Sequence, residues 1–135
     1  MSEFYEQYFC PDNEEFSLII DDNGQVCYAY LLKGEEVIGD VWLYNQSNAP
    51  ASVNWNDVES MPFLNPMEYI DDSVRFSPFT KDTPILVDWD YDKDLCQVKI
   101  IKENSTLGIL KPNSKPGWSN SVIKDGPLAL RIDVV

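Results

Sequence analysis

The stretch FSLIIDDNGQVCYAYLLKGEEVIGDVWLY, residues 16–44, decides the fold because its apolar side chains recur at every second position. Phe16, Leu18 and Ile20 share one face of an extended segment, as the period of a half-buried strand requires. The tripeptide Asp22-Asn23-Gly24 then supplies the residue types that a tight hairpin turn favours. The sequence therefore predicts a strand that ends in a hairpin turn.

Two further strands follow in the same stretch. Residues 25–32 are apolar on both faces, which predicts a central position in a sheet. Lys33-Gly34-Glu35 provides another turn, and apolar residues alternate again over residues 36–44. Three strands joined by two short turns form an antiparallel meander.

The second half of the chain repeats this organisation. Strands are predicted over residues 84–89, 95–102 and 106–110, and turn residues separate them. The loop KPNSKPGWSN follows, and alternation over residues 128–134 predicts a last strand, with a short helix over residues 128–132 as the alternative. A second meander is therefore expected.

Helical signals are few and short. Four aromatic residues behind Ser2 predict a short helix over residues 4–9. Residues 45–66 contain three prolines and many Asn and Ser residues, which predicts a long irregular connection. Asn65-Pro66-Met67-Glu68 has a cap residue, an early proline and an early glutamate, so a second short helix is predicted to reach about Asp71.

These elements predict one mainly β domain, or an α+β domain, over residues 1–135. The expected architecture is an antiparallel sheet or sandwich of about six or seven strands with one or two short helices. The chain is 135 residues long, with 44% hydrophobic and 24% charged residues, so it can bury a core without disulfides.

Charge is distributed unevenly along the chain. The formal net charge is −13, and residues 1–72 hold 15 acidic residues and a single base, Lys33. Residues 73–135 hold 8 acidic and 9 basic residues. Such a field repels nucleic-acid phosphates and anionic lipids and attracts basic proteins. A merely solvated acidic surface is the alternative, although solubility alone does not require bases to be excluded from the first half.

The composition argues against several other classes of protein. No apolar run approaches the roughly 20 residues of a membrane span, and the acidic N-terminus predicts a cytoplasmic protein. Cys10, Cys27 and Cys96 have no metal-site spacing, and Cys27 and Cys96 are expected to be small core residues. Histidine is absent, and no activated nucleophile is recognisable. We expect no enzyme, no cofactor and no metal.

The acidic run VDWDYDKD, residues 87–94, has two possible interpretations. A calcium loop of the EF-hand type that started at Asp88 needs glycine at its sixth position and glutamate at its twelfth. Lys93 and Lys99 occupy those positions, so a hairpin turn is favoured over a metal site.

The tryptophans also have two interpretations. Trp42 lies in a predicted strand and is expected to be packed, whereas Trp55 and Trp118 lie in predicted loops rich in Pro, Asn and Ser. Loop tryptophans either pin their loops onto the sheet or anchor a bound partner.

Three segments resemble recurrent stretches of small bacterial proteins. They are VWLYNQSNAP (residues 41–50), MPFLNP (61–66) and KPGWSNSVIKDGPLA (115–129). Some of the proteins that contain such stretches resemble immunity proteins of toxin systems. The resemblance implies a cytosolic protein that binds and occludes a cognate toxin, and it transfers no site residue.

The resulting hypothesis is an acidic, non-enzymatic protein that binds a basic protein partner, such as a toxin, and neither nucleic acid nor membrane. Acidic side chains at turns and in the long connection, together with two loop tryptophans, are the candidate partner-binding residues: Asp21, Asp22, Glu35, Glu36, Asp57, Glu59, Asp71, Asp72, Trp55 and Trp118. A small-ligand or carbohydrate-binding module that uses the loop aromatics is the alternative. An enzyme with a paired carboxylate site comes third.

Overall fold

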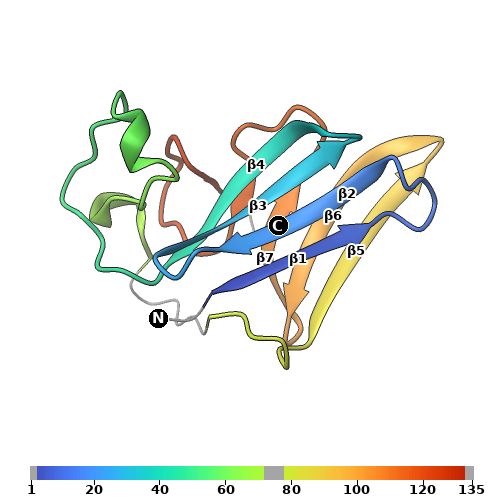
Figure 1. Ribbon diagram of the computed structural model, residues 1–135, viewed down its shortest axis with the longest axis horizontal. Helices are drawn as coiled ribbons and strands as arrows, with labels where there is room; N and C mark the ends of the chain where they lie inside the picture. The colour runs from blue at the N-terminus through green and yellow to red at the C-terminus, as the bar shows by residue number, and fades with distance from the viewer. Residues whose placement is uncertain (1–2, 72–77, 133–135) are drawn as a thin grey trace.

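The computed structural model describes residues 3–71 and 78–132 and confirms a mainly β fold (Figure 1). Two sheets face each other across one hydrophobic core. The strands are β1 (Phe4–Phe9), β2 (Phe16–Asp22), β3 (Val26–Lys33), β4 (Glu36–Asn45), β5 (Ile85–Asp92), β6 (Asp94–Lys102), β7 (Ser105–Leu110), β8 (Trp118–Ser119) and β9 (Leu130–Arg131). Two 3-10 turns, η1 (Val58–Ser60) and η2 (Met67–Tyr69), lie in the long connection.

The first sheet is the predicted meander extended by one strand. Its order is β1-β2-β3-β4, and every neighbouring pair is antiparallel. β3 is central, as its two apolar faces predicted. Gly24 and Gly34 adopt φ values of 90° and 62° in the two hairpin turns, a conformation that glycine tolerates best.

The second sheet has the order β5-β6-β7-β8-β9. β5, β6 and β7 form the predicted second meander, and β8 and β9 add two short strands, of which β9 runs parallel to β8. Lys93 and Asn104 adopt φ values of 66° and 67° in the tight turns of this meander.

The two lateral sides of the sandwich differ. On one side the segment before β8 and the segment before β9 bond to the edge of β4. The Asp40 N–H donates to the Ser114 carbonyl (3.0 Å), the Gly117 N–H to the Asp40 carbonyl (2.7 Å) and the Trp42 N–H to the Leu128 carbonyl (3.0 Å). β1 and β5 border the other side, each as the outermost strand of its sheet. The sandwich is therefore closed along β4 and has two edge strands opposite.

The core confirms the predictions for Trp42 and Cys27. Leu18, Ile20 and Leu31 from the first sheet and Val98 and Leu110 from the second are fully buried between the sheets. Cys27 is buried on the inner face, whereas Trp42 is buried on the outer face of the first sheet, where its indole N–H donates to the Asn45 side-chain oxygen (2.8 Å).

The predicted helix over residues 4–9 is wrong. This segment is strand β1, in which Phe4 and Tyr8 point toward the core side and Tyr5 and Phe9 away from it. Over only six residues, paired aromatic side chains fit the period of a helix as well as the period of a strand. Pairing with β2 satisfies the backbone groups on one side of the segment, whereas an isolated helix of this length does not form.

Three other predictions are corrected in detail. The helix after Asn65 is one 3-10 turn, and Pro66 caps it instead of starting it. The last strand is only Leu130–Arg131 within the described residues, and residues 133–135 lie outside them. The sequence predicts a loop around Trp118, but Trp118 belongs to β8, because its backbone pairs with Ile109 of β7.

Candidate functional site

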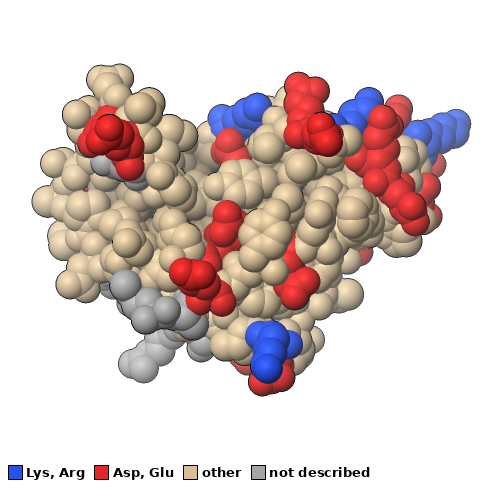
Figure 2. Space-filling view, viewed as in Figure 1, with Lys and Arg blue, Asp and Glu red and all other residues tan. Residues whose placement is uncertain are grey.

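The outer face of the first sheet, which points away from the core, carries exposed aromatic side chains. Register and alternation arrange its residues in cross-strand rows. The rows are Tyr5–Asp21–Tyr28–Trp42, Gln7–Ile19–Tyr30–Asp40 and Phe9–Ser17–Leu32–Val37. We call the accessible part of these rows the aromatic face; it comprises Tyr5, Gln7, Phe9, Ile19, Asp21, Tyr30, Leu32, Val37 and Asp40. Figure 2 views the molecule from this side.

Two aromatic residues of this face are largely open to solvent. Tyr5 and Phe9 are 61% and 56% exposed, whereas Tyr30 is half-buried and stacks on Tyr28 with the ring centroids 6.1 Å apart. Burial raises the pKa of Tyr30 to about 12, and the nearby carboxylates of Asp21 and Asp40 act in the same direction. Tyr30 is therefore a neutral hydrogen-bonding group at physiological pH.

Ionisation of the two carboxyl groups of the aromatic face, Asp21 and Asp40, costs free energy in the folded chain. Burial raises the pKa of Asp21, and the carboxylates of Asp22 and Glu3 raise it further. Burial also raises the pKa of Asp40, and the Lys115 ammonium opposes this only in part. A cation placed over this face would relieve both shifts, because an opposite charge favours the ionised carboxyl group.

Asp22 is not a surface carboxylate, so its interpretation as an exposed turn residue is wrong. Its side chain is 1% exposed and continues the inward face of Phe16, Leu18 and Ile20. The carboxylate accepts hydrogen bonds from the Tyr44 hydroxyl (2.6 Å), the Gly24 N–H (2.9 Å) and the Gln46 amide (2.7 and 2.8 Å). Asp22 therefore fixes the β2–β3 turn from inside.

Three turns meet at one end of the sandwich. The Gly34 N–H of the β3–β4 turn donates to the Glu15 carbonyl (2.7 Å), and the Asn13 side chain of the β1–β2 turn donates to the Tyr91 hydroxyl of β5 (3.3 Å). These turns carry a group of carboxylates that we call the acidic end: Asp12, Glu14, Glu15, Glu35, Glu36, Asp92 and Asp94.

The acidic end adjoins the aromatic face, since the Phe9–Ser17–Leu32–Val37 row precedes the β1–β2 and β3–β4 turns in register. Figure 2 shows carboxylates gathered at this end, with lysines beside them, and further carboxylates across the face. Lys33 and Lys93 belong to the same turns. Among the residues that the structure describes, no lysine or arginine nitrogen lies within 4.0 Å of the carboxylates of Asp12, Glu14, Glu15, Glu35 or Glu36.

The predicted acidic residues do not form a single patch. Glu35 and Glu36 belong to the acidic end, and Asp21 lies on the aromatic face. Asp57 and Glu59 lie in the long connection (green in Figure 1), beyond the opposite end of the sheet. Asp71 is half-buried after η2, and Asp72 lies outside the described residues.

Trp55 and Trp118 are also far apart in the fold. Trp55 is 40% exposed and packs edge-on against Phe63 in the connection, with the ring centroids 5.2 Å apart. Trp118 is half-buried on β8, where the Lys111 ammonium lies 5.1 Å from its ring centroid. The structure thus does not bring the two tryptophans together as one stacking platform.

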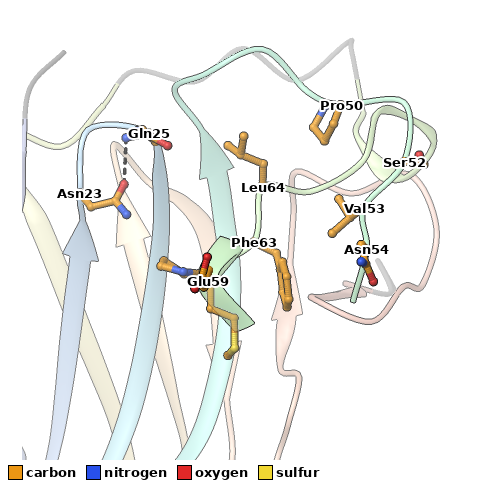
Figure 3. Close-up of a pocket in the computed structure, with 11 residues that line it drawn as sticks. Asn23, Gln25, Pro50, Ser52, Val53, Asn54, Glu59, Phe63 and Leu64 are labelled. Atoms are coloured by element: carbon orange, nitrogen blue, oxygen red, sulfur yellow. Dashed lines mark hydrogen bonds between the residues drawn. The ribbon is translucent and has the colours of Figure 1, made fainter. Parts of the chain in front are cut away.

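A pocket of about 420 Å³ lies beside the β2–β3 turn (Figure 3). The Asn23–Gln25 turn forms one side of this pocket and residues 50–54 the other, with Phe63 and Glu59 between them. The Asn23 side chain is already engaged, because it accepts hydrogen bonds from the Gln25 and Val26 N–H groups (2.9 and 3.0 Å). Neither Trp55 nor Trp118 lines the pocket.

The run from Asp88 to Asp94 is a hairpin, as the favoured interpretation predicted. Asp92 pairs with Asp94 across Lys93, so the turn is tighter than the five-residue turn expected from the sequence. Asp88, Asp90 and Asp92 point to the exposed side of β5. Within residues 3–71 and 78–132, no three acidic or cysteine side chains are grouped as metal ligands.

Sequence reasoning missed Tyr5, Phe9 and Asp40 as site residues. The first two were assigned to a helix, and a strand-period reading of residues 4–9 would have placed both on one face. The alternation of Phe16, Leu18, Ile20 and Asp22 was likewise enough to predict that Asp22 points inward.

Comparison with known proteins adds no family. No family model, no curated protein and no solved structure matches this chain significantly. None of the helices in the described part of the chain is long and apolar enough to cross a membrane. The resemblance to immunity proteins therefore stays a prediction.

Proposed function

We propose that this chain is a non-enzymatic protein that binds a basic protein partner through the aromatic face and the acidic end, in the manner of an immunity protein. One observation carries the proposal: Tyr5 and Phe9 are exposed on a face that also holds the carboxylates of Asp21 and Asp40. Desolvated aromatic anchors supply most of the binding energy at protein interfaces, and surrounding charges steer association.

The charge of the chain supports a cationic partner. The net charge is −13, and the acidic end extends the aromatic face with further carboxylates. The raised pKa values of Asp21 and Asp40 give the partner a specific role, since an incoming lysine or arginine would stabilise both ionised groups. Solubility alone does not require acidic groups beside exposed aromatic rings.

The experiment begins with the immobilised chain, from which bound proteins are eluted by salt and identified by mass spectrometry; the product of the adjoining gene is tested directly as the first candidate. Association of the purified partner is then measured by stopped flow at several ionic strengths. The variant Glu35→Lys with Glu36→Lys should slow association about tenfold at low salt and weaken its salt dependence.

The matched control is Asp82→Lys with Glu103→Lys, which changes the net charge by the same amount. Both control residues are exposed and lie in turns away from the acidic end. Equal slowing in both variants would mean that only the total charge matters. An unchanged rate in the first variant would place Glu35 and Glu36 outside the contact.

A further inference from the structure

Strand β1 has backbone groups that no other part of the described chain uses. The Cys10 N–H donates to the Phe16 carbonyl (3.0 Å), and this pair continues the register in which Tyr8 faces Leu18 and Glu6 faces Ile20. Hydrogen-bonded pairs alternate along an antiparallel ladder. The even-numbered residues of β1 therefore bond to β2, and the N–H and C=O groups of Tyr5, Gln7 and Phe9 point away from the sheet.

No described residue satisfies these outward groups. Tyr5, Gln7 and Phe9 have exposed side chains and take part in no backbone hydrogen bond outside the ladder with β2. The strand pairs with β2 without a bulge and contains no proline or lysine. An edge with these properties is a template on which another strand can pair.

The other edge on the same side of the sandwich is protected. β5 carries Asp88, Asp90 and Asp92 on its exposed side and has a bulge between Asp90 and Tyr91. Charged side chains and bulges are the devices by which edge strands avoid pairing. β1 has no bulge and a single charged residue, Glu6, so it is the less protected of these two edges.

We infer that a basic extended segment of a protein partner adds to β1 as a fifth strand of the first sheet, so that its apolar residues lie beside Tyr5 and Phe9 and its lysines or arginines beside Glu6. The inference rests on the proposed function and specifies how the partner binds. Directly opposed residues of neighbouring strands approach within about 5 Å, which is close enough for a charged pair with Glu6.

Charge decides between this occupant and a second copy of the chain. Self-pairing would bring two molecules of net charge −13 edge to edge, whereas a basic strand is attracted by Glu3 and Glu6 along this edge and by Asp21 on the neighbouring strand β2. We therefore assign the edge to a cationic partner strand.

The test uses a peptide of about eight residues in which lysine and valine alternate, with an equally long glutamate–valine peptide for comparison. Binding to the full chain is measured by NMR titration at low salt. The lysine–valine peptide should bind with a Kd of about 1 mM or below, and the glutamate–valine peptide at least about tenfold more weakly. Equal binding of both peptides would overturn the assignment to a basic strand.

Two changes isolate the backbone contribution. Gln7→Pro removes an outward N–H and should weaken peptide binding at least about tenfold, whereas Gln7→Ala, which loses the same side-chain bond to Ser17 (3.1 Å), should stay within about threefold of the native chain. An alternating peptide with N-methylated valines tests the same contact without altering the protein, and it should also bind at least about tenfold more weakly.

The outcomes separate this inference from the proposed function. Binding that survives both backbone changes, but falls when Asp21→Lys and Asp40→Lys are introduced together, would overturn strand addition and leave the aromatic face as the contact. Binding that depends on the backbone and is unchanged by those charge reversals would support strand addition and contradict the proposal that the aromatic face is the contact. Dimerisation of the free chain that Gln7→Pro abolishes would assign the edge to a second copy and overturn the inference.

Discussion

The two edge strands β1 and β5 border the same side of the sandwich but differ in the side chains that they expose to solvent. β5 presents Asp88, Asp90 and Asp92 and is bulged, whereas β1 presents Tyr5, Gln7 and Phe9 and is regular. A chain that can protect one edge with carboxylates can protect the other by the same means. This difference between the two edges is the observation on which the proposed pairing of a partner strand with β1 rests.

The first prediction concerns how firmly the two edges are held by the core. Phe4 is 9% exposed and packs against Phe79, with the ring centroids 5.5 Å apart, whereas Ile85 of β5 is half-buried. Phe4→Ala should lower the free energy of unfolding by about 3 kcal/mol, and Ile85→Ala by about 1–2 kcal/mol. Urea unfolding measures both values. If Phe4→Ala lowered the free energy of unfolding no more than Ile85→Ala, the prediction that the core holds β1 more firmly than β5 would be contradicted.

The second prediction concerns the exposed aromatic residues. Tyr5→Ala and Phe9→Ala should each weaken binding of the lysine–valine peptide by about tenfold, with stability changes below about 1 kcal/mol, because these side chains are 61% and 56% exposed in the free chain. Leu86→Ala on β5 is the control, since Leu86 is 59% exposed on the other edge. Titration of the three variants with the lysine–valine peptide measures these effects. If Leu86→Ala weakened peptide binding as much as Tyr5→Ala, the account would be contradicted.

The third prediction removes the protection of β5. Asp88→Val together with Asp90→Val should make this edge resemble β1 and cause association of the chain at concentrations where the native protein is monodisperse. Analytical ultracentrifugation measures the change. The control Asp82→Val with Glu103→Val removes the same charge away from the edge, and equal association there would mean that net charge, and not the edge, prevents pairing.

The fourth and smallest effect concerns pH. The pKa of Asp40 is raised in the folded chain, chiefly by burial, so ionisation destabilises the fold. The free-energy cost of this ionisation is absent at a pH below the ordinary pKa of 3.8, and it is complete at a pH above the raised pKa of the folded chain. Asp40→Asn should therefore be slightly more stable than the native chain at pH 7, and the gain should vanish as the pH falls toward 3.8.

Thermal unfolding at a series of pH values measures this difference. The same variant should leave binding of the lysine–valine peptide along β1 nearly unchanged, because Asp40 lies on β4, the strand farthest from β1 in the first sheet. A stability gain that persists at pH 3 would show that the carboxylate charge is not its cause.

The sequence predicted the fold class because apolar side chains recur at every second residue of its strands. Residues 16–44 specify three strands and both turns, and Lys93 occupies a turn that the acidic run around it predicted. The prediction of a helix over residues 4–9 is wrong because six residues with paired aromatic side chains fit the helical period and the strand period equally well. Only pairing with β2 decides in favour of a strand. β8 and β9 are two residues long, and their pairing depends on neighbours distant in the sequence.

The candidate site was predictable only in part. The acidic excess of the first half was visible in the composition, but which carboxylates come together depends on the turns that meet at one end. Glu35 and Glu36 are joined there by Asp12, Glu14 and Glu15, while Asp57 and Glu59 lie at the other end of the sheet. Asp21 and Asp22 are adjacent in sequence and point to opposite faces, which is how a strand separates neighbouring residues.

The central claim is that a cationic strand binds along β1, and amide hydrogen exchange at single-residue resolution tests it most directly. With saturating lysine–valine peptide, exchange of the Tyr5, Gln7 and Phe9 amides should slow at least about tenfold, while the amides of Glu6 and Tyr8, which already bond to β2, change little. Peptide binding that leaves these three amides unprotected, or that protects amides of β5 instead, would contradict the account.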